Sequence, residues 1–191
     1  MRTHQPRLTP LPDDALDAAQ DAILAPFRKS GRDYNIFRTF LRYPKALKVF
    51  LGWGSHILSD QNSLPPRLRE LAILRTGYRC RAGYEFARHV VIARREGFDD
   101  ADISAIKGDA DDRHWSPLEQ AIMAATDALV TDQFIPDALW TTLSGLFDER
   151  QLLDLIFTVG QYTMVSMFLN SVGVPLDDDV TLDPDLDARD A

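Results

Sequence analysis

The chain has 191 residues, and hydrophobic side chains make up 45% of it, enough for a compact domain to fold without disulfide or metal staples. Its one cysteine, Cys80, excludes an internal disulfide framework, a CxxC redox pair and a cysteine zinc finger within one chain. The net charge of -8 argues against a general nucleic-acid binder.

The charge is unevenly distributed along the chain. Residues 177–191 hold seven aspartates and one arginine, which predicts a disordered or loosely packed acidic tail behind a single domain over residues 1–176. Residues 67–95 hold eight arginines against two glutamates. This basic segment is either a solvated face, a set of salt bridges to a partner subunit, or a pocket for an anionic substrate.

No secretory signal is expected, because the N-terminus lacks an apolar core segment, and a reduced cytoplasmic location is the default. The most apolar stretch, residues 152–174, is long enough to span a membrane but is interrupted by Asp154, Gln161 and Asn170. We therefore expect a long buried helix there and no membrane partner.

Apolar residues recur with a helical period and long strand-like alternation is absent, so the sequence predicts an all-α fold. The first expected helix is capped by Asp13 or Asp14 and ends before residue 30, and the second is capped by Asn35 and is broken or kinked at Pro44. The helices expected after these, in chain order, are 67–78, 83–96, a short helix from Asp99 or Asp100 to about 108, 116–130, one after Pro136, and 148–171.

Three helix ends carry local signals. Ser116 and Glu119 form a capping-box pattern with Pro117 between them, Gly97 is a good C-terminal stop, and Asp148 begins the last helix with Gln151 three residues on. A weak internal echo relates residues 67–73 to residues 117–123, which share apolar spacing after a proline-containing start. Two duplicated helical halves would fit this pattern.

The candidate chemistry lies between residues 70 and 89. Glu85 and His89 are four residues apart, so they share one helix face, and Glu70 lies on the apolar face of the preceding helix. If these helices pair, two carboxylates and an imidazole share a partly dry site suited to proton transfer near neutral pH. The alternative is an ordinary surface Glu–His pair. A metal site is not expected, because HExxH and a second histidine on this face are missing.

Residues 66–75 (PRLRELAILR) and 83–90 (GYEFARHV) resemble the carboxymuconolactone decarboxylase family, which includes the AhpD-like alkylhydroperoxidases. The core of the resemblance covers about residues 60–110, and the N-terminal extension, residues 1–58, resembles the front half of longer members. The resemblance implies an AhpD-like helical fold and a homo-oligomer, typically a trimer or hexamer, with a dimer as a further alternative.

In the AhpD-like branch, a glutamate precedes a CxxC motif by twelve residues and a histidine follows its second cysteine by four. Glu70 and His89 match this glutamate and histidine, but Ala82 and Glu85 stand at the two cysteine positions. A thiol peroxidase of this branch needs both thiols, so the sequence is similar to the non-redox, decarboxylase-like branch.

That branch implies decarboxylation of a small anionic lactone in aromatic-acid catabolism, without a cofactor. The expected catalytic residues are Glu70, Glu85 and His89, with the proton donor left open between His89 and Glu70. Arg75 and Arg88 are the first choices for binding the substrate carboxylates. Two alternatives remain: a non-catalytic helical oligomer that binds a small ligand, and an alkylhydroperoxidase, which the missing cysteines disfavour.

Overall fold

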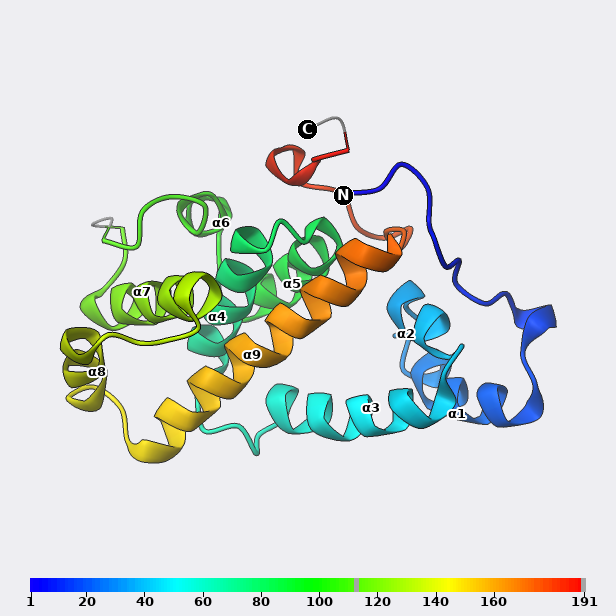
Figure 1. Cartoon of the computed structure of the whole chain (residues 1–191), viewed down its shortest axis with the longest axis horizontal. Coiled ribbons are helices and arrows are strands. Elements are labelled where there is room, and N and C mark those ends of the chain that lie inside the picture. The colour runs from blue at the N-terminus through cyan, green and yellow to red at the C-terminus, as the bar shows by residue number, and fades with distance from the viewer. Residues whose placement is uncertain (112–113, 190–191) are drawn as a thin grey trace.

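A computed structural model of the chain describes residues 1–111 and 114–189, and within them the fold is all-helical (Figure 1). The α-helices are α1 (Ala18–Lys29), α2 (Asn35–Phe40), α3 (Pro44–Leu58), α4 (Pro66–Arg79), α5 (Gly83–Arg95), α6 (Asp100–Ala105), α7 (Pro117–Asp132), α8 (Asp137–Ser144) and α9 (Glu149–Val172). Short 3-10 turns, η1 (Asp13–Ala15) and η2 (Pro184–Leu186), lie near the two ends. The all-α fold class predicted from the sequence is therefore confirmed.

Helix α4 is the centre of the fold. Every residue from Leu68 to Gly77 is buried, and α4 packs against α5, α7 and α9 (Figure 1). Leu71 and Leu74 are fully enclosed in the main core, where truncation of such a side chain to alanine costs about 2–5 kcal/mol. The segments of the sequence echo become α4 and α7, which lie against each other.

The capping signals are confirmed. The Ser116 side chain accepts from the backbone N–H of Glu119, and Glu119 accepts from the backbone N–H of Ser116. Asp148 and Gln151 form the same arrangement at the start of α9. Gly97 and Gly173 follow their helices with φ angles of 86° and 72°, a conformation that a glycine adopts without strain.

Three local predictions at the N-terminal end are corrected. The cap of α1 is Asp17, whose carboxylate accepts from two backbone N–H groups, whereas Asp13 lies in η1. Asn35 is the first residue of α2 rather than its cap, and its side chain donates to the carbonyls of residues 175 and 176. Pro44 does not kink a helix but begins α3, where its missing N–H costs nothing.

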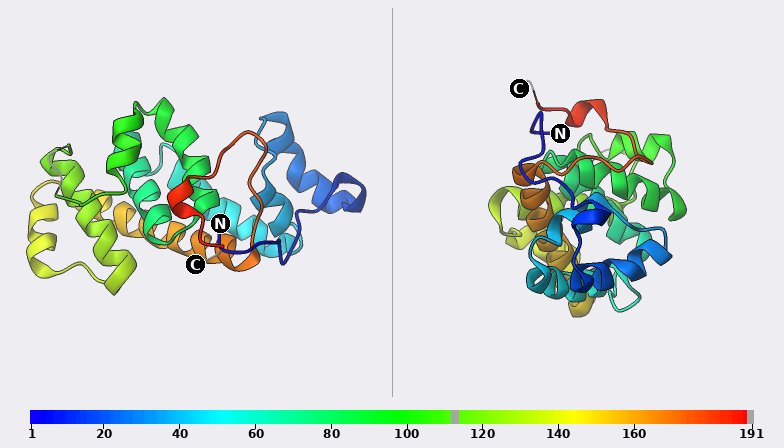
Figure 2. Two further views of the ribbon diagram at one scale, coloured as in Figure 1. Left: turned by 90° about the horizontal axis from the view of Figure 1, so that it is seen from above. Right: turned by 90° about the vertical axis from the view of Figure 1, so that its right-hand side faces the viewer.

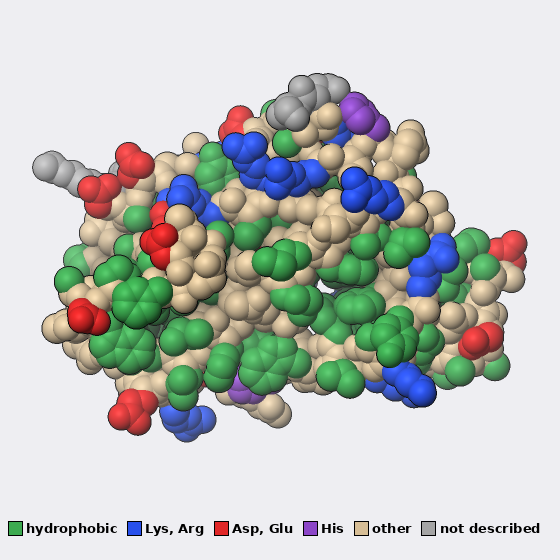
Figure 3. Space-filling view, viewed as in Figure 1, with side chains coloured by type: hydrophobic (Ala, Val, Ile, Leu, Met, Phe, Trp, Pro, Cys, Tyr) green, Lys and Arg blue, Asp and Glu red, His purple; other side chains and the backbone are tan. Residues whose placement is uncertain are grey.

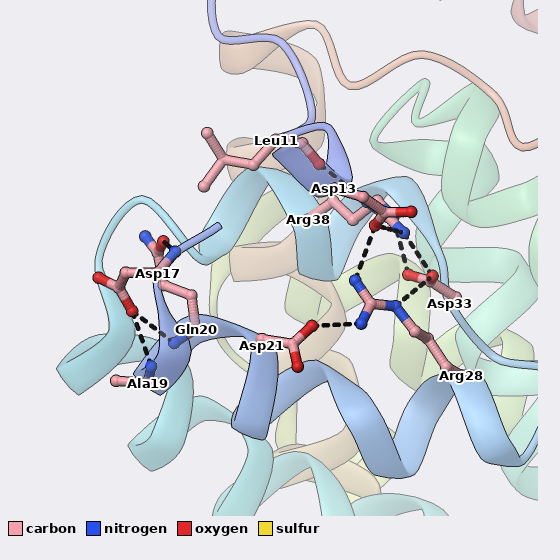
Figure 4. Close-up of polar contacts among 9 residues, drawn as sticks. All are labelled: Leu11, Asp13, Asp17, Ala19, Gln20, Asp21, Arg28, Asp33 and Arg38. Carbon is pink, nitrogen blue, oxygen red and sulfur yellow. Dashed lines mark hydrogen bonds and ion pairs between the residues drawn. The ribbon is translucent and has the colours of Figure 1, made fainter. Parts of the chain in front are cut away.

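The N-terminal extension is held together by an ion-pair cluster (Figure 4). The Arg38 guanidinium bonds both oxygens of Asp33 and also Asp13, and Arg28 bonds Asp13 and Asp21. These contacts join η1, α1 and α2. Phe40 of α2 then stacks on Phe168 of α9 with ring centroids 4.7 Å apart, which fixes the extension against the main body.

The acidic C-terminal segment does not form the loose tail expected from its composition. Asp177 is buried and accepts from the backbone N–H of Asn35, from Tyr84 and from Arg88. Further along, Lys107 pairs with Asp183. The segment therefore packs because its aspartates meet cations and N–H groups of distant helices, which composition does not show. Residues 190–191 of the predicted tail lie outside the described residues.

The two ends of the chain lie side by side (Figures 1 and 2). The backbone N–H of Ala188 donates to the carbonyl of Met1 at 2.8 Å, and the Met1 ammonium donates to the carbonyl of Leu186. Burial lowers the pKa of this ammonium.

Helix α9 is long and apolar enough to cross a membrane by length and composition alone. However, 56% of its most apolar window is buried inside the fold, as in the core helix of a soluble protein. The expected buried helix is therefore found, with one face left exposed.

Candidate active site

Three helices bring the predicted catalytic residues together. Glu70 lies on α4, Glu85 and His89 lie one turn apart on α5, and α9 closes the site with Tyr162 and Ser166. The close pairing of α4 with α5 depends on Gly77. A Cβ at that position would stand 3.4 Å from Oε1 of Glu85 and 3.5 Å from the backbone nitrogen of Phe86.

Glu70 and His89 form a direct pair. Oε2 of Glu70 lies 2.8 Å from Nδ1 of His89, and the two residues are only 1% and 6% exposed. A carboxylate only accepts hydrogen bonds, so Nδ1 carries the proton and Nε2 is the nitrogen without one in the neutral ring. Within the described part of the chain no residue hydrogen-bonds Nε2. The pair thus orients an imidazole and leaves one of its nitrogens available.

Glu85 is held in a different state. It is 2% exposed, its Oε1 accepts from the Ser166 hydroxyl at 3.2 Å, and its Oε2 is buried with no partner among the described residues. Burial raises the pKa of Glu85 well above its ordinary value; the Ser166 hydrogen bond opposes this and the charge of Glu70 adds to it. Glu85 is thereby kept in its neutral form, in which a carboxyl group can donate a proton in acid–base catalysis.

Tyr162 completes the cluster from α9. Its ring meets the His89 ring edge-on, with centroids 4.8 Å apart, and packs with Ile57 and Ile73. Burial raises the pKa of the Tyr162 hydroxyl well above its ordinary value, with Glu70 and Glu85 adding to the effect. This tyrosine stays neutral and forms an apolar wall with one polar tip.

Arg69 is a cation whose charge acts on this wall. It lowers the pKa of the Tyr162 hydroxyl, whereas the two glutamates raise it. Arg69 is only 8% exposed. Its Nη1 donates to the carbonyl of Ser59, and its Nε has no partner among the described residues. A buried guanidinium whose Nε lacks a partner is a candidate for holding an anionic group.

Arg75 lies elsewhere, and its donors are already engaged. Its guanidinium forms a bidentate pair with Asp127 at 2.7 and 2.6 Å, and Nη1 donates to the carbonyls of Ile106 and Gly108. The arginine predicted for substrate binding instead ties α4 to α7 and to the segment after α6. The structure does not bring it together with the glutamates and the histidine.

Arg88 is engaged in the same way by the C-terminal segment. It donates to Asp177 at 2.8 Å and to both oxygens of Asp179, and its guanidinium carbon lies 4.0 Å from the centre of the Tyr34 ring. Basic residues of segment 67–95 are thus neutralised by acids of this chain. The count of charges in this segment could not show which carboxylate each arginine pairs with.

Cys80 lies at the edge of the cluster without an activated thiolate. Burial raises the pKa of the Cys80 thiol, and Glu85 adds to this, while Ser166 and Thr163 oppose it. Ala82, at the first cysteine position of the redox motif, is fully buried. Among the described residues, no group of three or more histidine, cysteine, aspartate or glutamate side chains is arranged to hold a metal ion.

Sequence reasoning missed Arg69, Tyr162 and Ser166 as parts of the site. A signal existed for the last two, because Tyr162 and Ser166 are polar residues one turn apart within an apolar helix. Arg69 precedes Glu70 directly in the sequence, and adjacent residues of a helix point to different faces. The helical spacing therefore did not place Arg69 with Glu70, Glu85 and His89.

Comparison with known proteins agrees with this architecture. The model of the carboxymuconolactone decarboxylase family matches residues 44–128, just under half of the chain. No curated protein matches the chain. Solved structures share the fold at low sequence identity.

An uncharacterized peroxidase-related protein with an alkylhydroperoxidase AhpD core, from Ralstonia eutropha, superposes with a TM-score of 0.77 at 16% identity, over 90% of this chain and 94% of that one. A peroxidase-related protein from Silicibacter sp. gives 0.73 at 15% identity, over 92% and 91%. A cysteine-to-alanine variant of the debrominase Bmp8, in complex with 2,3,4-tribromopyrrole, gives 0.75 at 15% identity, over 92% and 94%. Residues 44–128 therefore match the pattern of the carboxymuconolactone decarboxylase family, and the fold is similar to those of AhpD-like proteins, in agreement with the resemblance found in the sequence.

Proposed function

We propose that the protein is a cofactor-free enzyme that uses acid–base chemistry to decarboxylate a small anionic lactone or a related molecule. One observation supports this above the others. A buried histidine oriented by Glu70 lies on the same helix face as Glu85, a carboxyl group whose proton is retained by burial. A structural ion pair alone does not require a second buried acid on the same helix face.

The reaction balances without an external electron carrier. The bond between the substrate carbon and its carboxylate breaks, carbon dioxide leaves, and the electron pair spreads into the conjugated lactone carbonyl. The carbon then takes one proton. We assign this delivery to Glu85, which holds a proton, while His89, fixed through Nδ1 by Glu70, exchanges a proton through Nε2 and restores the acid.

Substrate binding is assigned to Arg69 in place of Arg75 and Arg88. Its Nε has no partner among the described residues, and its charge reaches the Tyr162 hydroxyl at the cluster. A guanidinium pairs a carboxylate through two parallel hydrogen bonds, and it gives direction as well as charge. Tyr162 supplies a flat apolar surface for the ring of the substrate.

The comparisons support a small ring-shaped substrate but not one identity. The family takes its name from carboxymuconolactone, and the debrominase with the same fold was solved with a brominated pyrrole. An alkylhydroperoxidase activity is disfavoured by Ala82 and Glu85 at the two cysteine positions. A cytoplasmic location, with no nucleic-acid or membrane partner, remains our expectation.

We also propose self-association through the exposed face of α9. The exposed face carries Leu153, Phe157, Gly160, Met164 and Met167, which follow one another at spacings of four, three, four and three residues. Each of the four hydrophobic side chains is at least 41% exposed. This spacing is typical of the seam through which one helix packs against another, and Gly160 leaves room for close approach. Figure 3 shows hydrophobic side chains gathered along this face.

The test is a spectrophotometric decarboxylation assay on carboxymuconolactone and a panel of small anionic lactones. Wild-type protein should release carbon dioxide, and Glu85→Gln and His89→Asn should each lower kcat by about 10²–10⁴-fold. Glu149→Gln, an exposed glutamate at the start of α9, is the matched control and should keep full activity. If both site variants turned over every accepted substrate at the wild-type rate, the acid–base assignment would be wrong. Ligand binding with no turnover by wild-type protein would favour the non-catalytic oligomer instead.

A further inference from the structure

A surface cavity of about 290 Å³, largely open to solvent, lies between the N-terminal arm and the C-terminal end of α9, away from the Glu70–His89 pair. Arg2, Thr3 and Arg7 of the arm line one side, and Asn170 and Ser171 of α9 line the other. Every lining residue is neutral or cationic, in a chain whose net charge is -8. Such a cavity attracts anions locally even though the whole protein repels them.

The arm that forms this cavity is held in place. The backbone N–H of Arg7 donates to the carbonyl of Val172 at 2.8 Å, and Met1 is bonded to the C-terminal segment. The arm passes so close to Gly173 that a Cβ at Gly173 would collide with the Thr3 hydroxyl. The lining side chains therefore project from fixed backbone on both sides.

The two arginines of the cavity differ in their contacts within the fold. Arg7 donates through Nη1 to the carbonyl of Ser171 at 3.1 Å, so it caps the end of α9. Arg2 makes no hydrogen bond or ion pair with any residue in the described part of the chain, and its side chain stays at the rim of the cavity. Helix capping therefore gives Arg7 a structural role, whereas no contact within the described residues gives one to Arg2.

The cavity is also connected to the candidate active site through direct contacts. The Asn170 side chain donates to the carbonyl of Cys80 at 2.9 Å. The Cys80 thiol contacts Ser166, whose hydroxyl donates to Glu85. An occupant of the cavity would thus touch the residue that positions the loop between α4 and α5, three contacts from the buried acid.

We propose that this cavity binds the carboxylate or phosphate group of a small molecule, with Arg2 and Arg7 as the two cations. Guanidinium groups bind planar or tetrahedral oxyanions through paired, charge-assisted hydrogen bonds. The remaining amide N–H of Asn170 and the Ser171 hydroxyl supply neutral donors at the same wall. The volume suits a small anion or the anionic end of a larger metabolite.

The first test measures binding directly, with inorganic phosphate and succinate as probes at constant ionic strength. Calorimetry should show binding to wild-type protein, and the melting temperature should rise with probe concentration. Arg2→Gln should weaken binding by about tenfold or more, because it removes the guanidinium of this cavity that makes no hydrogen bond or ion pair among the described residues. Arg150→Gln, an exposed arginine at the other end of α9, is the control and should bind as wild type. Equal binding by wild type and Arg2→Gln would overturn the proposal.

A second experiment, steady-state kinetics of Arg2→Gln, distinguishes whether the anionic group belongs to the substrate or to a separate ligand. If the group belongs to the substrate, Arg2→Gln should raise KM for an anionic substrate with kcat unchanged. If it belongs to a separate ligand, turnover should stay the same while phosphate binding is lost. Absence of phosphate and succinate binding in a protein that still decarboxylates its substrate would overturn this site and leave the proposed function intact.

Discussion

Nδ1 of His89 lies 2.8 Å from Oε2 of Glu70 inside a site where neither residue is more than 6% exposed. The pair spans two helices and nineteen positions in sequence. Its burial fixes both the position of the imidazole ring and the nitrogen that holds the proton.

Glu70→Gln should lower kcat by about 10²-fold or more while KM changes little, because the amide can donate to Nδ1 and so selects the wrong tautomer of His89. A merely structural role predicts a loss of folded protein instead. Circular dichroism and the melting temperature should therefore stay near wild type while kcat falls. A Glu70→Gln variant with wild-type kcat would show that the pair does not orient a reacting group.

The raised pKa of Glu85 makes folding dependent on pH. The unfolded chain ionises this carboxyl near pH 4.5, whereas the folded chain keeps it protonated to well above that value. Its contribution to stability is fully present below about pH 4.5 and is lost as pH rises through the folded pKa, with a slope of at most about 1.4 kcal/mol per pH unit.

Glu85→Gln cannot ionise, so its free energy of unfolding should fall less than that of wild type between pH 4.5 and 8. Urea unfolding at several pH values measures this difference, with Glu149→Gln as the exposed control. Turnover by wild-type protein should decline over the same range as the acid loses its proton. Parallel stability curves for wild type and Glu85→Gln would contradict the buried-acid assignment.

Arg69→Lys should raise KM for an anionic substrate by about tenfold, because an ammonium group cannot form the paired hydrogen bonds of a guanidinium. The charge is kept, so kcat should change less than KM. Arg75→Lys is the comparison, since Arg75 pairs with Asp127 and should affect stability and leave KM alone. Steady-state kinetics of both variants separates the two roles. An unchanged KM for Arg69→Lys would remove this residue from the site.

The C-terminal segment should contribute to stability through one buried carboxylate. Asp177→Asn weakens the contacts to Arg88, Tyr84 and the backbone of Asn35 together, so we expect a loss of about 1–3 kcal/mol. Asp178→Asn, an exposed neighbour, should cost less than about 0.5 kcal/mol. Denaturant midpoints for the two variants measure the difference. Equal midpoints would mean that the segment is loosely packed in solution.

The sequence predicted what is decided locally. The capping boxes at Ser116 and Asp148 need only residues three positions apart, and Glu85 and His89 share a face by helical spacing alone. The partners of Arg88 lie about ninety positions away, so no local pattern shows that Asp177 neutralises it. Tyr162 and Arg69 join the site only through the packing of α9 and α4, which depends on tertiary contacts.

Self-association through α9 gives the last prediction. Met167→Glu places a charge on the exposed seam, 64% exposed in the single chain, so folding should be unaffected while a partner helix would have to bury that charge. Light scattering coupled to size exclusion should show a dimer or larger oligomer for wild type and a shift toward monomer for Met167→Glu. Gln61→Glu, in an exposed loop, adds the same charge away from the seam and should leave the mass unchanged. A monomeric wild type, or an oligomer indifferent to Met167→Glu, would assign this apolar face to some other role.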